Sequence, residues 1–494
     1  MLLNQGFTTL SKKGRLILFA LIPVLSLLLH FHVFNMDLLG FHVWRQTETQ
    51  TVIDNFYRED FNILNSRVNN RGNGTGIFRM EFPIMQWLFA CVYKVFGYHI
   101  IISRILTFIL GLFSVWGMYR LVYAIFRNEN MALIAAWCFN FSPLFYYYTM
   151  NPIPDNFAVC TSIWGMAYFF EWIAGGKNIK VLWSAFFLGL AILAKMPFAV
   201  YLGGIGVYFV AAFFRKEKTE RKRLYTGALI YTICLLAPAL WYLSVVSTWH
   251  GNGIVQGILS VTAKDIPRLL DIMVGNLIST LPEMLVNYGA LLFFLAGVYF
   301  LFRNKANKKP LFIVFLFWGI SVILYFLFEM NMIGMVHDYY MFPFLPLLFI
   351  IVSYGGWHLF NQPVKWLKAL SIVAICILPL TAFIRIDHRW NLADPGFNRD
   401  LMVYKTDLQH AVPDNAIVIA GNDVSPFIFL YYINKKGWVF NNDSLSAKDM
   451  EAMVILGAKY LYSDSRKVEA DTGVNKFIDK LIAQKGSIKV FSLK

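Results

Sequence analysis

Five short segments of the sequence place ionisable or hydrogen-bonding side chains beside long apolar runs. An acid in such a position could act as a general base or bind a metal, and a cation could hold a phosphate. The segments are Trp44-Arg45-Gln46-Thr47-Glu48, Met80-Glu81-Phe82-Pro83, Asn151-Pro152-Ile153-Pro154-Asp155, Leu193-Ala194-Lys195-Met196-Pro197 and His337-Asp338-Tyr339-Tyr340.

The three acidic segments allow a chemical and a structural interpretation. Glu48 could be a base or metal ligand, but Arg45 and Glu48 could also pair on a surface helix, three residues apart. Glu81 could bind a hydroxyl-rich ligand, or it could be a first-turn acid favoured by the helix dipole. Asp155 opens a further helix, where a ligand-facing carboxylate and a helix cap look alike in sequence.

The basic and aromatic segments are similarly open. Lys195 interrupts a nearly continuous apolar tract, which makes it a functional candidate; it could hold a lipid phosphate or extend to the membrane interface. The segment from His337 to Tyr340 combines a titratable ring, an acid and two phenols. That combination suits a binding site, but it also suits an aromatic belt with a paired His and Asp.

The elements that carry these side chains are predicted to be membrane spans. Of the 494 residues, 58% are hydrophobic and 15% are charged, whereas soluble proteins run near 25% charged. This composition excludes a disordered chain, a collagen-like fibre and an ordinary soluble enzyme. About eleven apolar runs approach the roughly 20 residues that cross a bilayer. The runs are 15–34, 99–126, 131–149, 156–174, 180–195, 197–215, 224–246, 284–303, 310–329, 339–358 and 366–386.

The distribution of charge orients the spans. The net charge of +15 could indicate nucleic-acid binding, but the basic residues are dispersed over alternate loops. The short links 151–155 and 329–338 contain no Lys or Arg. By the positive-inside rule, the N-terminus is cytoplasmic, and an odd number of spans leaves the C-terminus outside. We therefore expect membrane lipid, and no nucleic acid, as a partner.

Three long segments are predicted to lie outside the membrane: 35–98, 247–283 and everything after 386. The first contains a weakly amphipathic stretch at 49–57 and an apolar run at 83–96, which is too short to span and suits an interfacial helix. The last is predicted to be a small α/β domain that folds without disulfides, since it contains no Cys. Its predicted strands are 416–420, 438–440, 460–462 and 488–491, and its predicted helices are 427–432 and 446–456.

The order of these motifs resembles the GT-C superfamily of membrane glycosyltransferases, close to bacterial relatives of the protein O-mannosyltransferases and the lipid A aminoarabinose transferase. The resemblance covers essentially the whole chain. It is carried by Glu81-Phe82-Pro83 before an apolar run ending at Phe96-Gly97, Arg104, Pro154-Asp155, Leu193-Ala194-Lys195, and His337-Asp338-Tyr339-Tyr340 before Pro343 and Pro346.

The resemblance implies a multi-pass protein of the bacterial plasma (inner) membrane, with a transmembrane catalytic domain at 1–386 and an extracytoplasmic or periplasmic α/β domain at 387–494. Such an enzyme transfers a hexose or pentose from a polyprenyl phosphate to an extracytoplasmic hydroxyl of a glycan, lipid or protein, with inversion. The alternatives are a flippase or transporter of lipid-linked glycans and a non-enzymatic envelope assembly protein. The sequence shows no internal repeat of the kind that many transporters have.

The resemblance also assigns roles. Asp155 matches a second-loop acid, and Lys195 matches a Lys that contacts the phosphate. Many relatives have an Asp-Glu pair where Arg45-Gln46 stands here, and a Lys where Phe82 stands. Since Glu48 is the nearest acid, about one helical turn on, we predict that Glu48, or Asp155 with it, activates the acceptor.

The remaining predicted roles concern binding. Arg45, Lys195 and His337 are predicted to bind the donor phosphate, and Glu48 and Asp155 could hold Mg or Mn through carboxylate oxygens. The residues predicted to contact the substrates are Gln46, Glu81, Asp338, Tyr339 and Tyr340.

Overall fold

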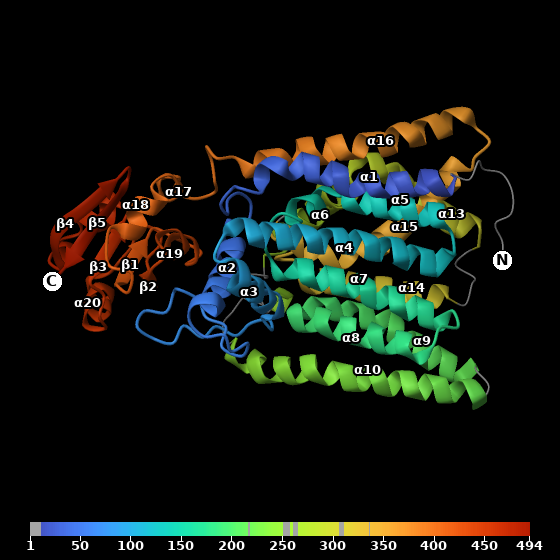
Figure 1. Cartoon of the computed structure of the whole chain (residues 1–494), viewed down its shortest axis with the longest axis horizontal. Helices are drawn as coiled ribbons and strands as arrows, with labels where there is room; N and C mark the ends of the chain where they lie inside the picture. Colours follow the sequence, from blue (N-terminus) through green and yellow to red (C-terminus); the bar gives the residue numbers. More distant parts are fainter. Residues whose placement is uncertain (1–10, 216–217, 250–256, 260–264, 306–310, 335) are drawn as a thin grey trace.

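The computed structural model describes residues 11–215, 218–249, 257–259, 265–305, 311–334 and 336–494. It consists of a long helical bundle with a small sheet domain at one end (Figure 1). Helices α2 (Val43–Arg58) and α3 (Ile84–Phe96) lie at this end of the bundle, next to the sheet domain. We call this the tail-side end, and we call the residues after α16 (Lys365–Asp387) the tail.

The bundle consists largely of the predicted apolar runs. Besides α16, its helices are α1 (Lys12–His30), α4 (Ile100–Phe126), α5 (Glu129–Asn140), α6 (Pro143–Tyr148), α7 (Pro154–Ile173), α8 (Asn178–Ala194), α9 (Tyr201–Arg215), α10 (Lys218–Val245), α13 (Tyr288–Arg303), α14 (Phe312–Phe328) and α15 (Leu345–Phe360). Seven helical stretches of the described chain are long and apolar enough to cross a membrane, and six coincide with predicted runs. Four further apolar helices are shorter, so the count of about eleven spans stays a prediction.

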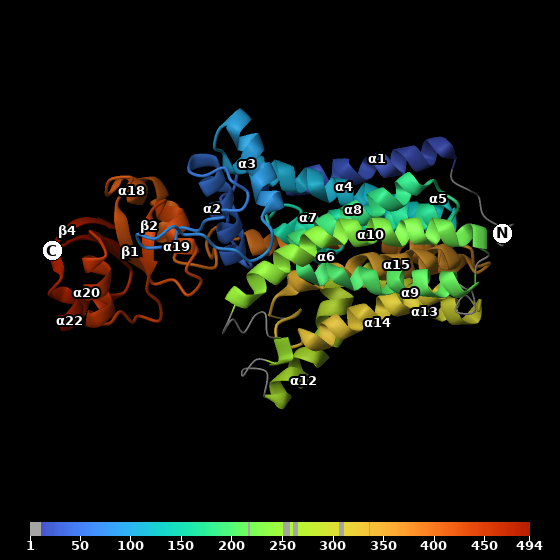
Figure 2. The same ribbon diagram turned by 90° about the horizontal axis from the view of Figure 1, so that it is seen from below.

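Two segments differ from the prediction. The run 131–149 is not one helix, because α5 ends at Asn140 and α6 begins at Pro143. A proline lacks the amide hydrogen of a helix interior but suits the first turn, so it begins a new helix. The predicted outer segment 247–283 holds α12 (Ile266–Gly275) and the start of a π-helix (Asn276–Val286), which together form the seventh long apolar stretch. Figure 2 shows α12 projecting away from the bundle.

Helix α7 lies in the middle of the bundle, and its packing against α8 sets the positions of Asp155 and Lys195. Most of its side chains are buried, as expected for a helix that is apolar on all sides. A Cβ at Gly165 would lie 2.6 Å from Leu188 Cγ, so the small residue lets α7 and α8 approach closely. Asp155 begins α7 and Lys195 follows α8, and the antiparallel packing brings both to the tail-side end.

The tail forms a five-stranded mixed sheet in the order β2-β1-β3-β5-β4. Its strands are β1 (Ile417–Gly421), β2 (Lys436–Val439), β3 (Tyr460–Ser463), β4 (Ile478–Lys485) and β5 (Ile488–Leu493). Strand β1 pairs in parallel with β2 and β3, and β5 pairs antiparallel with β3 and β4. The predicted strands correspond to β1, β2, β3 and β5. The prediction missed β4, whose side chains are mostly exposed and lack an apolar run.

Helices cover both faces of this sheet. One face packs on α18 (Lys405–His410) and α19 (Ile428–Ile433), and the other packs on α20 (Ala447–Ile455), α21 (Arg466–Ala470) and α22 (Thr472–Asn475). The short α17 (Asp400–Val403) precedes them. Because both faces of β1 are covered, its sequence is a continuous apolar run.

The tail holds the start of the first outer loop in place. Leu38 and Val43 join the apolar core between the sheet and α19. The Tyr431 hydroxyl and the Lys405 ammonium group both contact the carboxylate of Asp37, at 2.8 and 2.5 Å. These contacts fix the segment that leads into α2, and therefore the position of the side chains on the first turns of α2.

The tail also pairs with the middle of this loop. The amides of Arg71 and Gly72 donate to the carbonyl of Gly437, at 3.0 and 2.8 Å, and the Gly437 amide donates to Asn69. The loop thus covers β2, which would otherwise be an exposed edge strand.

Candidate functional site

Five ionisable side chains meet at the tail-side end, and we call them the charged cluster. They are Arg45, Glu48, Glu81, Asp155 and Lys195. The Arg45 guanidinium donates to Glu48 at 2.6 Å and also contacts Glu81. The Lys195 ammonium lies 3.9 Å from Glu81 and 3.8 Å from Asp155. Residues from four separate stretches of sequence, predicted individually, thus form one continuous network.

Local structure explains how each member arrives there. Arg45 and Glu48 are three residues apart on α2, so they share a face of the helix. Glu81 stands in the loop before α3, where the Phe82 amide donates to the carbonyl of Leu193 at 3.0 Å. This hydrogen bond ties the Glu81 loop to the end of α8, beside Lys195. The predicted pairing of Arg45 with Glu48 is confirmed, but the pair does not lie on a surface, because the two residues have exposed fractions of only 5% and 6%.

The two glutamates that share Arg45 have different electrostatic environments. Burial raises the pKa of Glu48 above its ordinary value, and the Arg45 charge opposes the rise only in part. Burial acts on Glu81 in the same direction, but Arg45 and Lys195 together lower its pKa below the ordinary value. Glu81 therefore carries the negative charge that holds the two cations together.

Four rings lie beside the charged cluster, and we call them the aromatic wall: His42, His337, Tyr339 and Tyr340. The Lys195 ammonium lies 5.6 Å from the ring of Tyr340, in the 3-10 helix η8 (Asp338–Phe344). The rings of His42 and Tyr339 are 5.2 Å apart, and so are the rings of His42 and His337. Burial, assisted by the neighbouring His42, lowers the pKa of His337 to about 3. A neutral ring can still bind the donor phosphate through a hydrogen bond, so the predicted role of His337 in phosphate binding stays a prediction.

Two predicted substrate-binding residues are engaged in structural contacts. Asp338 accepts a hydrogen bond from Tyr148 at 2.6 Å and from Arg389 at 2.8 Å. Gln46 donates to the carbonyl of Phe41 at 3.1 Å, which shapes the turn before α2. Both side chains make contacts within the walls of the site, and their predicted contacts with the substrates stay predictions.

Three residues near the charged cluster were missed in the sequence. Arg389 pairs with Asp338, and His42 is the ring of the aromatic wall that lies beside Asp338. Glu329 is a buried acid just after α14. A signal for Glu329 was available, because the short link 329–338 contains acids and no Lys or Arg. Arg389 lies beyond the last predicted span, and no sequence feature connects it with Asp338.

The charged cluster does not fit the predicted Mg or Mn site. Glu48 faces Arg45 and Asp155 faces Lys195, so a cation of the protein already stands beside each carboxylate. In the described part of the chain, no three His, Cys, Asp or Glu side chains gather in a way that could hold a metal. A metal stays a prediction from the sequence, and we derive no step through it.

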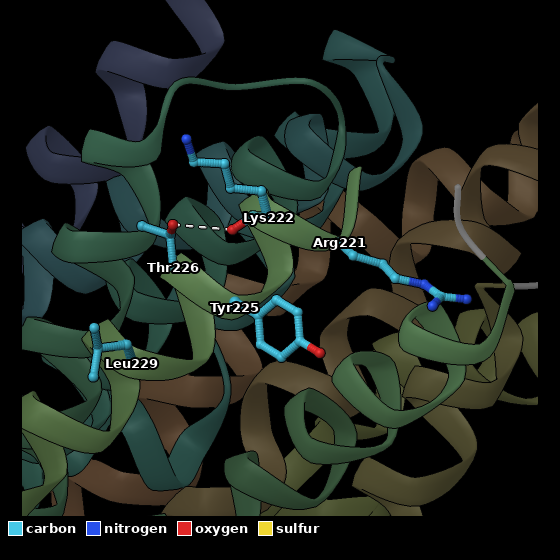
Figure 3. Close-up of a pocket in the computed structure, with 5 residues that line it drawn as sticks. All are labelled: Arg221, Lys222, Tyr225, Thr226 and Leu229. Atoms are coloured by element: carbon cyan, nitrogen blue, oxygen red, sulfur yellow. Dashed lines mark hydrogen bonds between the residues drawn. The ribbon is translucent and has the colours of Figure 1, made fainter. Parts of the chain in front are cut away.

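Two hollows in the structure lie outside the charged cluster. One, of about 380 Å³, lies between the end of α2, the loop around Arg71 and the tail residues near Asn415. The other, of about 440 Å³, is lined entirely by α10 residues near the bundle end far from the tail, including Arg221, Lys222 and Tyr225 (Figure 3). Its two cations, Arg221 and Lys222, are already explained by the orientation of the spans by charge.

Comparisons with known proteins show which families and folds this chain is similar to. A family model described as dolichyl-phosphate-mannose-protein mannosyltransferase matches residues 81–242, which include Glu81, Asp155 and Lys195. The chain is similar to the solved structure of ArnT from Cupriavidus metallidurans bound to undecaprenyl phosphate, with a TM-score of 0.65 and 11% identity over 98% of each chain. Comparison with curated protein sequences finds no significant match.

Two further solved structures are similar. One is the archaeal oligosaccharyltransferase AglB from Archaeoglobus fulgidus, in complex with an inhibitory peptide and a dolichol-phosphate. Its TM-score is 0.58 at 11% identity, over 94% of this chain and 72% of that chain. The other is the arabinofuranosyltransferase AftD from Mycobacteria, with a TM-score of 0.59 at 11% identity, over 98% of this chain and 40% of that chain. The chain therefore has the fold of the GT-C superfamily of membrane glycosyltransferases, which confirms the resemblance. The family model and the fold together support a glycosyltransferase.

Proposed function

We propose that the protein transfers a sugar from a polyprenyl phosphate to an acceptor hydroxyl outside the bacterial inner membrane, with inversion at the anomeric carbon. One observation carries the proposal: the Glu81 carboxylate bridges two cations at the tail-side end, the buried Arg45 and the half-buried Lys195. Carboxylate and phosphate oxygens bind the same donors. The place that Glu81 occupies between the cations is thus suited to a phosphate of the donor.

The lipid part of the donor follows from the fold and the family model. ArnT and AglB, two of the similar structures, contain undecaprenyl phosphate and a dolichol-phosphate, and the matching family model describes a dolichyl-phosphate mannose enzyme. A polyprenyl chain needs an apolar surrounding, and the helices next to the charged cluster provide one. The tail and the polar end of the bundle then face the compartment that contains the acceptor.

In the proposed reaction, the acceptor oxygen attacks C1 of the sugar while the bond from C1 to the phosphate oxygen breaks. Arg45 and Lys195 neutralise the departing phosphate, and His337 donates a hydrogen bond to it. Because these groups are buried, their electrostatic stabilisation of the leaving group should be the largest contribution to the rate. Glu48 and Asp155 orient or activate the acceptor hydroxyl, and Tyr339 and Tyr340 line the sugar position.

The test is transfer of labelled sugar from a polyprenyl phosphate donor by the purified protein in detergent, with envelope extract of a deletion strain as acceptor. We expect turnover by the wild type and loss of about 10²-fold or more in Lys195→Ala, Glu48→Gln and Asp155→Asn. Binding of undecaprenyl phosphate should weaken only in Lys195→Ala. Absence of turnover with any polyprenyl phosphate sugar would overturn the function. Normal turnover in one variant would remove only that residue's role.

A further inference from the structure

Glu329 is a buried acid for which the proposed mechanism has no role so far. It directly follows α14, and its backbone is held firmly. Its amide donates to the carbonyl of Tyr325 at 2.9 Å, and its carbonyl accepts from the amides of Met332 and Ile333, at 2.9 and 2.8 Å. The side chain therefore extends from a fixed point of the link between α14 and η8.

A short chain of contacts connects Glu329 with the charged cluster. Tyr325, one helical turn before Glu329, donates its hydroxyl to the carbonyl of Tyr340 at 3.2 Å. The ring of Tyr340 in turn lies 5.6 Å from the Lys195 ammonium. Lys195 is the cation whose charge acts on Glu329, and the phenols of Tyr325 and Tyr340 are the titratable groups beside it.

The carboxylate of Glu329 lacks the partners that a buried acid needs. The residue is 8% exposed, and its Oε2 atom has no hydrogen-bond partner among the described residues. An unsatisfied buried carboxylate is costly, so such a group is retained where it serves a function. The free oxygen marks the position of a proton or of a donor group that arrives with a substrate.

The other acids of the site are less suited to accept a proton. Glu48 is hydrogen-bonded to Arg45, and Glu81 lies between Arg45 and Lys195. Asp155 Oδ2 also has no hydrogen-bond partner among the described residues, but the Lys195 ammonium lies 3.8 Å from it. A cation beside a buried carboxylate lowers its pKa relative to the same buried position without that cation. When the donor phosphate binds to the cations, the three acids of the charged cluster remain close to its negative charge. An acid further from the phosphate is therefore better placed to accept the proton of the acceptor.

We infer that Glu329 is the catalytic base, the group that removes the proton from the acceptor hydroxyl during transfer. The inference rests on the proposed function and extends it. The acceptor oxygen forms its bond to C1 of the sugar, the bond from C1 to the phosphate oxygen breaks, and the phosphate keeps that electron pair. The acceptor proton moves to Oε2 of Glu329 and is released to water after the products leave. Glu48 and Asp155 then hold and orient the acceptor.

The electrostatic environment agrees with this role. Burial raises the pKa of Glu329 to about 7, although the Lys195 charge opposes the rise. A general base works best when its pKa is near the working pH, where it is partly deprotonated and still basic. The base must be ionised to act, so kcat/KM should increase as the pH rises through about 7 and then level off.

The experiment measures transfer of labelled sugar from the polyprenyl phosphate donor between pH 5.5 and 9 for the wild type, Glu329→Gln and Glu329→Asp. Glu283→Gln is the control for the loss of an acid, because Glu283 pairs with Arg385 and lies outside the charged cluster. Binding of undecaprenyl phosphate is measured for every variant and reports whether the site has kept its fold.

We expect Glu329→Gln to lower kcat about 10²- to 10⁴-fold, to lose the rise of kcat/KM with pH, and to bind undecaprenyl phosphate like the wild type. Glu329→Asp should retain part of the activity and the pH dependence, and Glu283→Gln should behave like the wild type. The inference is overturned if Glu329→Gln keeps the wild-type kcat or pH profile, or if Glu329→Asp is as inactive as Glu329→Gln with no pH dependence left. A wild type that transfers no sugar refutes the proposed function itself.

Discussion

Replacement of Arg45 by Met tests whether the ion pairs of the charged cluster are buried and stabilise one another. Arg45 is the shared partner of Glu48 and Glu81, and all three residues are buried or nearly so. Removing one partner of a buried ion pair costs about 3–5 kcal/mol, because the remaining charge is left without compensation. Glu81 keeps Lys195 at 3.9 Å, so most of this cost should arise at Glu48.

The cost should depend on pH with a defined sign. Burial already raises the pKa of Glu48 in the wild type, and loss of Arg45 removes the charge that opposes the rise. A carboxyl with a folded-state pKa above its unfolded value, about 4.3, binds its proton more tightly in the folded state. The stability of Arg45→Met should therefore decrease as the pH rises above that value and through the folded pKa. We expect a larger loss at pH 8 than at pH 5.

Thermal unfolding in detergent, followed by tryptophan fluorescence at several pH values, measures the effect. Arg58→Met is the control, because Arg58 is exposed in the last turn of the same helix and should change the stability by about 0.5 kcal/mol or less. Combining Arg45→Met with Glu48→Gln and Glu81→Gln should restore much of the lost stability, since no charged carboxylate is then left beside the new Met side chain. An unfolding temperature equal to that of the wild type, or an equal decrease at pH 5 and pH 8, would refute the reasoning.

Two further predictions concern the parts that hold the site in place. Asp338→Asn should cost about 3–5 kcal/mol by leaving Arg389 without its buried partner, and the double variant with Arg389→Met should unfold closer to the wild type; equal stability of both variants would contradict the pairing. Gly72→Ala should loosen the first outer loop from the tail, because Gly72 has a φ of +55° and a Cβ there would lie 2.3 Å from the Trp438 ring. Limited proteolysis of the loop should then be faster than in the wild type and in Gly74→Ala, whose added Cβ comes no closer than 3.2 Å to a neighbour.

Much of the fold follows from local sequence patterns. The apolar runs predict most bundle helices because a segment of about 20 apolar residues is stable only in a bilayer or a protein core. The interfacial helix at 83–96 corresponds to α3, and the strand at 416–420 corresponds to β1. The prediction failed where the pattern was not local: the break before Pro143 leaves hydropathy unchanged, and the exposed strand β4 has no apolar run.

The candidate site divides in the same way. The sequence was sufficient to place acids and a lysine at the ends of apolar helices, because composition and charge decide where a helix leaves the membrane. Which of these residues touch was decided by tertiary packing alone. The contact of Arg45 with Glu81 joins α2 to the loop before α3, and the contact of Lys195 with Asp155 depends on how α7 and α8 pack. Periodicity describes one element at a time and contains no information on its neighbours.

The same limit applies to the roles of individual residues. Asp338 and Glu329 are both acids in one short link without cations, and the sequence favoured Asp338 because it stands next to a His and two Tyr residues. In the folded chain, Arg389 from beyond the last span binds Asp338, whereas Oε2 of Glu329 is buried without a hydrogen-bond partner among the described residues. Whether a buried acid has a partner in the protein is decided only when distant segments come together.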